Sequence, residues 1–69
     1  MKKYISAAKR KFKVGDYVSI INNDYFAGDW GVIKYINEDD GEYHVAMFNG
    51  DDQPIFYQDE LKLMKHKPI

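Results

Sequence analysis

The sequence predicts an all-β protein, a small and strongly bent barrel of five strands preceded by a flexible basic arm. The 69-residue chain contains eleven Val and Ile residues but only two Leu, and β-branched side chains favour a pleated sheet. Turn-forming residues recur at short spacing, and no stretch beyond the N-terminal segment has helical periodicity. Five short strands are too few for two full sheets, so a bent barrel that removes most exposed edges is the economical fold.

The first two strands are expected at residues 17–21 and 31–36. Gly15 and Asp16 form the turn that leads into the first strand. The polar residues between the two strands form a loop, and Gly28 and Gly31 would let its backbone bend sharply and pass close to the barrel.

The remaining strands are expected at residues 42–48, 54–57 and 61–64. The third follows a hairpin loop that ends at Gly41, a residue that can adopt the positive φ such loops need. Pro54 has no N–H for a β-ladder, so it marks a strand start or an edge. Residues 58–60 read as a 3₁₀ turn before the last strand.

Successive side chains of a strand point to opposite faces, so alternation groups Val18 with Ile20 on the first strand and Tyr43 with Val45 and Met47 on the third. Apolar residues of the other strands complete the predicted core. The predicted core residues are Val18, Ile20, Ile33, Ile36, Tyr43, Val45, Met47, Phe56, Leu61 and Leu63.

The chain divides into a flexible basic arm (residues 1–11), the barrel (residues 12–65) and a short tail (residues 66–69). It has no cysteine, which excludes a disulfide framework and a thiolate zinc site. The longest apolar run is four residues, at 45–48, so we expect neither a transmembrane helix nor a membrane partner. A cytoplasmic protein is the default expectation.

The net charge of −1 conceals a strong segregation of charge along the chain. Residues 14–60 contain all eleven carboxylates and only one lysine, Lys34, whereas nine of the ten basic residues lie in the two ends. Such asymmetry bears on partners and on electrostatic steering rather than on the fold.

Two segments resemble the KOW motif of SH3-like barrels: VGDYVSI at residues 14–20 and FAGDWGVI at residues 26–33. The segment FYQDELKL at residues 56–63 is similar to the ending of many SH3-like barrels. The resemblance covers residues 12–64 and implies an SH3-like barrel, of the kind found in ribosomal, transcription-associated and small bacterial or phage proteins. RNA-binding KOW domains usually carry basic residues in the loop around the two glycines. Here that loop is acidic and aromatic, so the nucleic-acid role does not transfer directly to it.

Aromatic side chains are the first candidate site, for a larger protein partner. Three rings lie in or beside one polar loop, and two further rings lie on the third strand, opposite its core face. The predicted partner-binding residues are Tyr25, Phe26, Trp30, His44 and Phe48. Aromatic anchors dominate protein interaction sites and base-stacking platforms. The structural alternatives are that Phe26 plugs one end of the barrel, that Trp30 lies across the second strand, and that Phe48 packs under the next loop.

Basic residues at the two ends are the alternative site, for DNA or RNA. The first and last strands of an SH3-like barrel are neighbours, so both ends would converge at one pole and hold phosphates. The predicted nucleic-acid-binding residues are Lys2, Lys3, Lys9, Arg10, Lys11, Lys13, Lys62 and Lys65.

Catalysis, metal binding and cofactor binding are not expected. His44 and His66 are far apart in the sequence, and the acidic clusters lack the spacing of an EF-hand. No Ser, His and acid form a recognisable catalytic arrangement, and the chain is short for a substrate pocket, so no small-molecule substrate is expected. The sequence therefore favours a non-enzymatic binding module that acts as a protein-interaction adaptor or as an inhibitor whose acidic loops imitate nucleic acid. The alternative is a nucleic-acid-associated accessory module.

Overall fold

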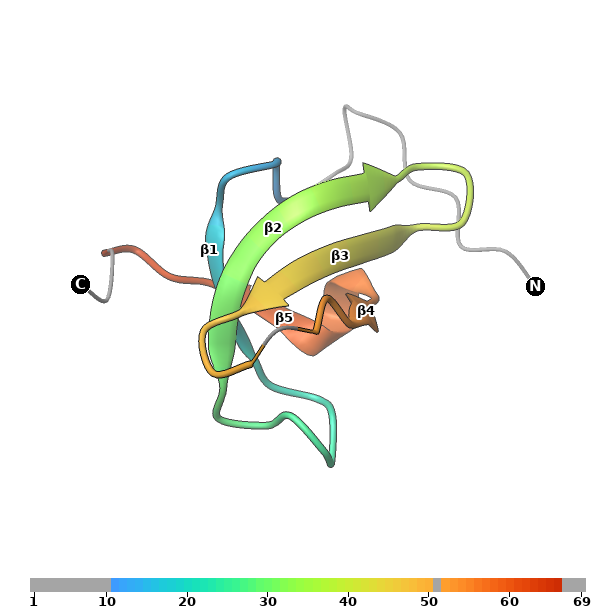
Figure 1. Ribbon diagram of the computed structural model, residues 1–69. Helices are drawn as coiled ribbons and strands as arrows, with labels where there is room; N and C mark the ends of the chain where they lie inside the picture. Colours follow the sequence, from blue (N-terminus) through green and yellow to red (C-terminus); the bar gives the residue numbers. More distant parts are fainter. Residues whose placement is uncertain (1–10, 51, 67–69) are drawn as a thin grey trace.

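The computed structural model describes residues 11–50 and 52–66, which form a single antiparallel sheet of five strands (Figure 1). The elements in chain order are β1 (Tyr17–Ile20), β2 (Trp30–Asn37), β3 (Glu42–Met47), β4 (Ile55–Phe56), the 3₁₀ turn η1 (Gln58–Glu60) and β5 (Leu61–Leu63). The strand order is β4-β3-β2-β1-β5, so β4 and β5 are the two edge strands. The predicted all-β fold with five strands is confirmed. The predicted arm lies outside the described residues except for Lys11, and so does the tail beyond His66.

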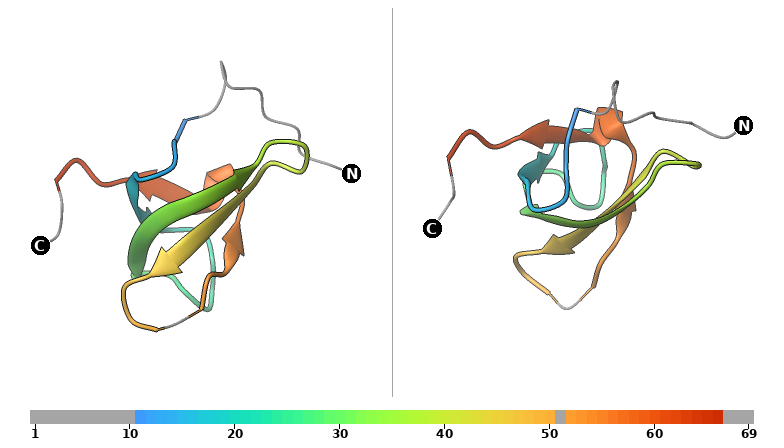
Figure 2. Two further views of the ribbon diagram at one scale, coloured as in Figure 1. Left: turned by 45° about the horizontal axis from the view of Figure 1, so that its top comes forward. Right: turned by 90° about the horizontal axis from the view of Figure 1, so that it is seen from above.

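The sheet is strongly bent, and its long central strand β2 carries most of the curvature (Figure 1). The pairing between β2 and β3 shifts between Ile33 and Tyr35, which leaves Lys34 as the extra residue of a β-bulge. A bulge increases the local twist and bends its strand. Seen from above, β5 and η1 lie across the interior from β2 and β3, so the strands surround a common core (Figure 2).

Two glycines lie where a side chain would not fit the backbone, one at a positive φ and one at a close approach of two strands. Gly41 has a φ of 69° and closes the hairpin between β2 and β3, as predicted. Gly31 has an ordinary φ, but a Cβ at this position would clash with the carbonyl oxygen of Ala46 and lie 2.7 Å from Val45 Cγ1. The close approach of β2 to β3 therefore depends on the missing side chain.

Nine apolar side chains form the core beneath the concave face of the sheet: Phe12, Val18, Ile20, Ile33, Tyr43, Val45, Met47, Phe56 and Leu61. Eight of them were predicted from the sequence, and Ile36, also predicted, is half-buried against the same cluster. Phe12 was not predicted, and its ring packs edge-on against Tyr43 at a centroid distance of 5.5 Å. The prediction for Leu63 was wrong: although it pairs with the core residue Val18, its side chain is 46% exposed, because β5 is an edge strand and no further described strand covers its outer side.

The loop between β1 and β2 (residues 21–29) is fixed by hydrogen bonds at its start. The Asn23 side-chain oxygen accepts bonds from the backbone N–H groups of Tyr25 and Phe26, both at 3.0 Å. The Asn23 amide also donates to Glu60, and the Asn22 amide donates to the Asp59 carbonyl oxygen at 2.7 Å. This loop is thus tied to η1, across the interior from β2.

Candidate partner-binding surface

The side of the sheet opposite the core, called the outer face below, carries two of the four exposed aromatic side chains that the structure describes, Tyr35 and Phe48. Strand pairing and alternation place twelve residues on it: Tyr17, Ser19, Trp30, Val32, Tyr35, Asn37, Glu42, His44, Ala46, Phe48, Ile55 and Lys62. Seven of these residues have apolar or aromatic side chains: Tyr17, Trp30, Val32, Tyr35, Ala46, Phe48 and Ile55. None of the seven belongs to the core cluster. An apolar sheet face of this kind is the surface feature that folding alone does not account for.

Tyr17, Trp30 and Phe48 form a continuous series of ring contacts, called the aromatic row below. Trp30 stacks on Phe48 with a centroid distance of 4.4 Å and an angle of 22°. On its other side, the Trp30 ring lies 6.0 Å from the ring of Tyr17. The backbone holds this arrangement, because the Phe48 N–H donates to the Trp30 carbonyl oxygen at 3.0 Å. Trp30 is half-buried between its neighbours, whereas Phe48 is 56% exposed.

A second group on the outer face lies beyond the bulge in β2. Tyr35 and His44 are opposite each other in the register, and their rings meet edge-on at 5.1 Å. Ile55 on the edge strand β4 pairs with His44 and is also exposed. Val32 and Ala46, which pair with each other, lie between this group and the aromatic row.

The two aromatic residues of the β1–β2 loop lie apart from the outer face. The Phe26 ring packs edge-on against the core residue Phe56 at 5.5 Å, so Phe26 covers one end of the core. Tyr25 contacts Phe26 at 4.7 Å and is 85% exposed, the highest value among the large apolar side chains described. Of the five predicted partner-binding residues, the structure thus brings together Trp30, His44 and Phe48 on the sheet and holds the other two in the loop.

Sequence reasoning missed Tyr17, Tyr35 and Ile55 as members of this surface. Alternation could have identified Tyr17, since Val18 and Ile20 were already assigned to the core face. Tyr35 was hidden by the bulge: strict alternation from Ile33 places it on the core side, and the extra residue moves it to the outer face.

Charges are distributed unevenly around the outer face. Residues 11–50 and 52–66 contain five lysines and ten carboxylates, a formal net charge of −5. Glu42 is the only carboxylate on the outer face among these residues, and it lies at the hairpin end. The other nine lie in loops, turns or η1: Asp16, Asp24, Asp29, Glu38, Asp39, Asp40, Asp52, Asp59 and Glu60. The outer face is therefore an apolar surface whose strand ends lead into acidic loops.

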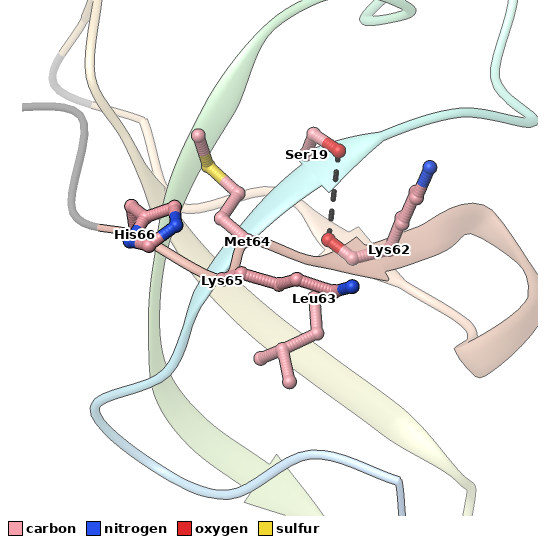
Figure 3. Close-up of a pocket in the computed structure, with 6 residues that line it drawn as sticks. All are labelled: Ser19, Lys62, Leu63, Met64, Lys65 and His66. Atoms are coloured by element: carbon pink, nitrogen blue, oxygen red, sulfur yellow. Dashed lines mark hydrogen bonds between the residues drawn. The ribbon is translucent and has the colours of Figure 1, made fainter.

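The predicted basic residues that the structure describes divide between two places. Lys62 and Lys65 line a shallow groove along β5 together with Ser19, Leu63, Met64 and His66 (Figure 3). Lys13 instead pairs with Asp16 at 3.0 Å, and the Lys11 N–H donates to the Gln58 side chain. Lys2, Lys3, Lys9 and Arg10 lie outside the described residues.

In the part of the chain that the structure describes, no cluster of three or more His, Asp or Glu side chains could hold a metal ion. Within residues 11–50 and 52–66, no helix has the length and apolar character needed to cross a membrane.

Comparison of the chain with protein-family models, with curated proteins and with solved structures finds no match. The physical properties of the surface are therefore the basis for assigning a function.

Proposed function

We propose that this chain is a small, non-enzymatic binding module with an SH3-like barrel, and that its outer face docks on a larger protein. The strand order and the 3₁₀ turn before β5 support the SH3-like assignment. The observation that carries the function is the aromatic row, a set of rings in mutual contact on a sheet face that the core does not use.

Aromatic rings on a rigid sheet suit a binding site for two reasons. They bury a large apolar area for a small loss of conformational entropy, and aromatic residues are enriched among the residues that dominate interface energies. Trp30 is already ordered by Phe48 on one side and by Tyr17 on the other. Binding would therefore cost little further side-chain ordering.

The charge around this surface indicates the chemistry of the partner. Acidic loops at the ends of the strands would face basic groups at the rim of the partner surface. Charge complementarity at a rim fixes orientation and raises the association rate more than it raises affinity. The expected partner is thus a protein with an apolar patch bordered by Lys or Arg. An inhibitor that occupies a nucleic-acid-binding surface through its acidic loops is a special case of this proposal.

The test compares two aromatic residues of different position. The full-length chain and its Trp30→Ala and Tyr25→Ala variants are immobilised, and the proteins that each captures from the native host are compared. The partner found in this way is then purified, and its affinity for each of the three chains is measured. We expect Trp30→Ala to weaken the purified complex by about 2 kcal/mol or more, the level of an interface hot spot. We expect Tyr25→Ala to retain binding, and circular dichroism checks that both variants are folded. Loss of the complex in Tyr25→Ala with full binding by Trp30→Ala would move the site from the sheet to the loop.

Nucleic-acid binding is the second candidate, and the position of Lys62 and Lys65 in one groove favours it. The net charge of −5 over the described residues opposes it, because phosphate neutralisation supplies most non-specific affinity. The measurement is fluorescence anisotropy of a labelled duplex and of a labelled single strand at several salt concentrations. Affinity that falls steeply with salt and disappears when residues 1–11 are deleted would establish this candidate instead.

A further inference from the structure

We infer that the outer edge of β5 binds an acidic protein segment in extended conformation, which adds to the sheet as a further strand. β5 is the last strand in the sheet order, and within residues 11–50 and 52–66 it pairs only with β1. An edge strand presents unpaired backbone groups to an incoming strand, and strand addition is a common form of peptide recognition. Ser19 and Lys62 share the outer face with the aromatic row, but the backbone groups that would pair lie at the edge of the sheet, beyond that row. The inference does not depend on the function proposed above.

The register of β1 and β5 shows which backbone groups point outward. The Met64 N–H donates to the Tyr17 carbonyl oxygen, and the Ile21 N–H donates to the Glu60 carbonyl oxygen, both at 2.9 Å. Lys62 lies midway between residues 60 and 64 and pairs with Ser19, so its backbone N–H and C=O also face β1. In an antiparallel ladder the intervening residue directs its N–H and C=O away from this neighbour. The backbone N–H and C=O of Leu63 therefore face the outer edge.

The side chains along this edge define the charge of the occupant. The groove is lined by Ser19, Lys62, Leu63, Met64, Lys65 and His66, with no carboxylate among them (Figure 3). Neither Lys62 nor Lys65 forms an ion pair with another described residue. Carboxylates of an added strand would meet uncompensated cations here. The exposed Leu63 side chain would at the same time lose contact with water.

Charge also disfavours the two other occupants. Two β5 edges from separate copies would place Lys62 and Lys65 of each chain close together, and lysine at an edge is a known means of preventing self-association. A nucleic acid would satisfy the lysines but has no peptide backbone to pair with Leu63. It would also approach a described chain with a net charge of −5.

The first experiment measures binding of a defined probe to the full-length chain. The probe is a capped, fluorescein-labelled peptide of about six residues, the usual strand length, with alternating Glu and Thr; a matched peptide has Lys in place of Glu. We expect anisotropy to show binding of the acidic peptide and at least about tenfold weaker binding of the basic one. The double variant Lys62→Glu/Lys65→Glu should lose at least about tenfold in affinity for the acidic peptide.

Lys34→Glu is the matched control, because Lys34 is also exposed but lies at the bulge in β2. We expect it to change the affinity by about twofold or less, as for a distant charge in physiological salt. An equal loss in Lys34→Glu would overturn the inference, since the probe would then respond only to net charge. Phe48→Ala should bind the peptide normally, so a failure at the edge and a failure at the aromatic row can be told apart.

The second experiment distinguishes an added strand from simple ion pairing. Amide hydrogen exchange of the free chain and of the peptide complex is compared at Leu63 and at Lys62. Strand addition should slow exchange at Leu63, whose N–H faces the edge, and leave Lys62 little changed because it already faces β1. Peptide binding without slower exchange at Leu63 would overturn the inference. Binding of a single-stranded oligo-dT probe in place of the peptide would do the same.

Discussion

The inner and outer faces of the sheet both carry aromatic rings, but the rings differ in what surrounds them. On the inner face, Tyr43 and Phe56 are 0% exposed and make edge-on contacts with Phe12 and Phe26. On the outer face, Trp30 and Phe48 contact each other; Phe48 is exposed and Trp30 is half-buried. Burial of the inner rings explains how a chain of this size folds. The outer rings contribute less to folding, so their arrangement is the part of the sequence that points to binding.

The largest expected effect is the loss of an inner ring. Phe56→Ala should destabilise the fold by about 3–5 kcal/mol, because it removes a fully buried ring and leaves a cavity. A domain of this size has little stability to lose, so the variant should be largely unfolded by circular dichroism at 25 °C. Phe56→Leu retains most of the volume and should stay folded with a lower midpoint in urea. Wild-type stability in Phe56→Ala would contradict the assignment of this ring to the core.

The second effect tests the close approach of β2 to β3. Gly31→Ala should cost about 1–3 kcal/mol, since the added methyl meets the Ala46 backbone and the Val45 side chain. Urea unfolding followed by circular dichroism measures it. Val32→Ala, one residue later on the outer face, is the control and should have the smaller effect. The reverse order would show that the two faces have been assigned incorrectly.

The third effect concerns the polar group of an inner ring. The Tyr43 hydroxyl donates to the Gln58 side-chain oxygen at 2.9 Å, a bond that links the core to η1. Tyr43→Phe removes this bond and keeps the ring, so we expect a loss of about 1 kcal/mol in unfolding free energy. Tyr35→Phe, a tyrosine on the outer face, should change the unfolding free energy less. If the two variants lost equal amounts of unfolding free energy, the hydroxyl of the inner tyrosine would be no more important for stability than that of the outer one.

The smallest effect on stability is expected from an outer ring. Phe48→Ala should cost only about 0.5 kcal/mol, the lower end of what an aromatic pair contributes. Its clearest signature is spectroscopic: Trp30 loses the ring stacked on it, so its fluorescence emission should shift to longer wavelength. A loss as large as that of Phe56→Ala would mean that the outer rings belong to the folding core and would remove the basis of the proposed function.

Strand alternation and turn residues were sufficient to predict most of the fold. Each predicted strand overlaps an observed one, and the 3₁₀ turn at residues 58–60 and the hairpin glycine Gly41 were placed correctly. Phe12 was missed because it lies outside any strand and reaches the core only through tertiary contact with Tyr43. Leu63 was assigned wrongly because alternation describes the direction of a side chain but not whether its strand lies at an edge of the sheet.

The candidate surface was predictable only in part. Residue type and alternation identified Trp30, His44 and Phe48, but the sequence could not separate them from Tyr25 and Phe26. That separation depends on how the β1–β2 loop folds back toward η1, which is fixed by hydrogen bonds between residues 37 positions apart in the chain. The groove along β5 was also not predicted, because it requires knowledge of which strand lies at the edge.

The single extra residue in β2 also limits the shape of any partner. Because the sheet bends at Lys34, the group around Trp30 and the group around Tyr35 form two facets that are tilted relative to each other. A flat protein surface can cover one facet but not both. A partner that engages the whole outer face must therefore be concave, or must approach with two separate projections.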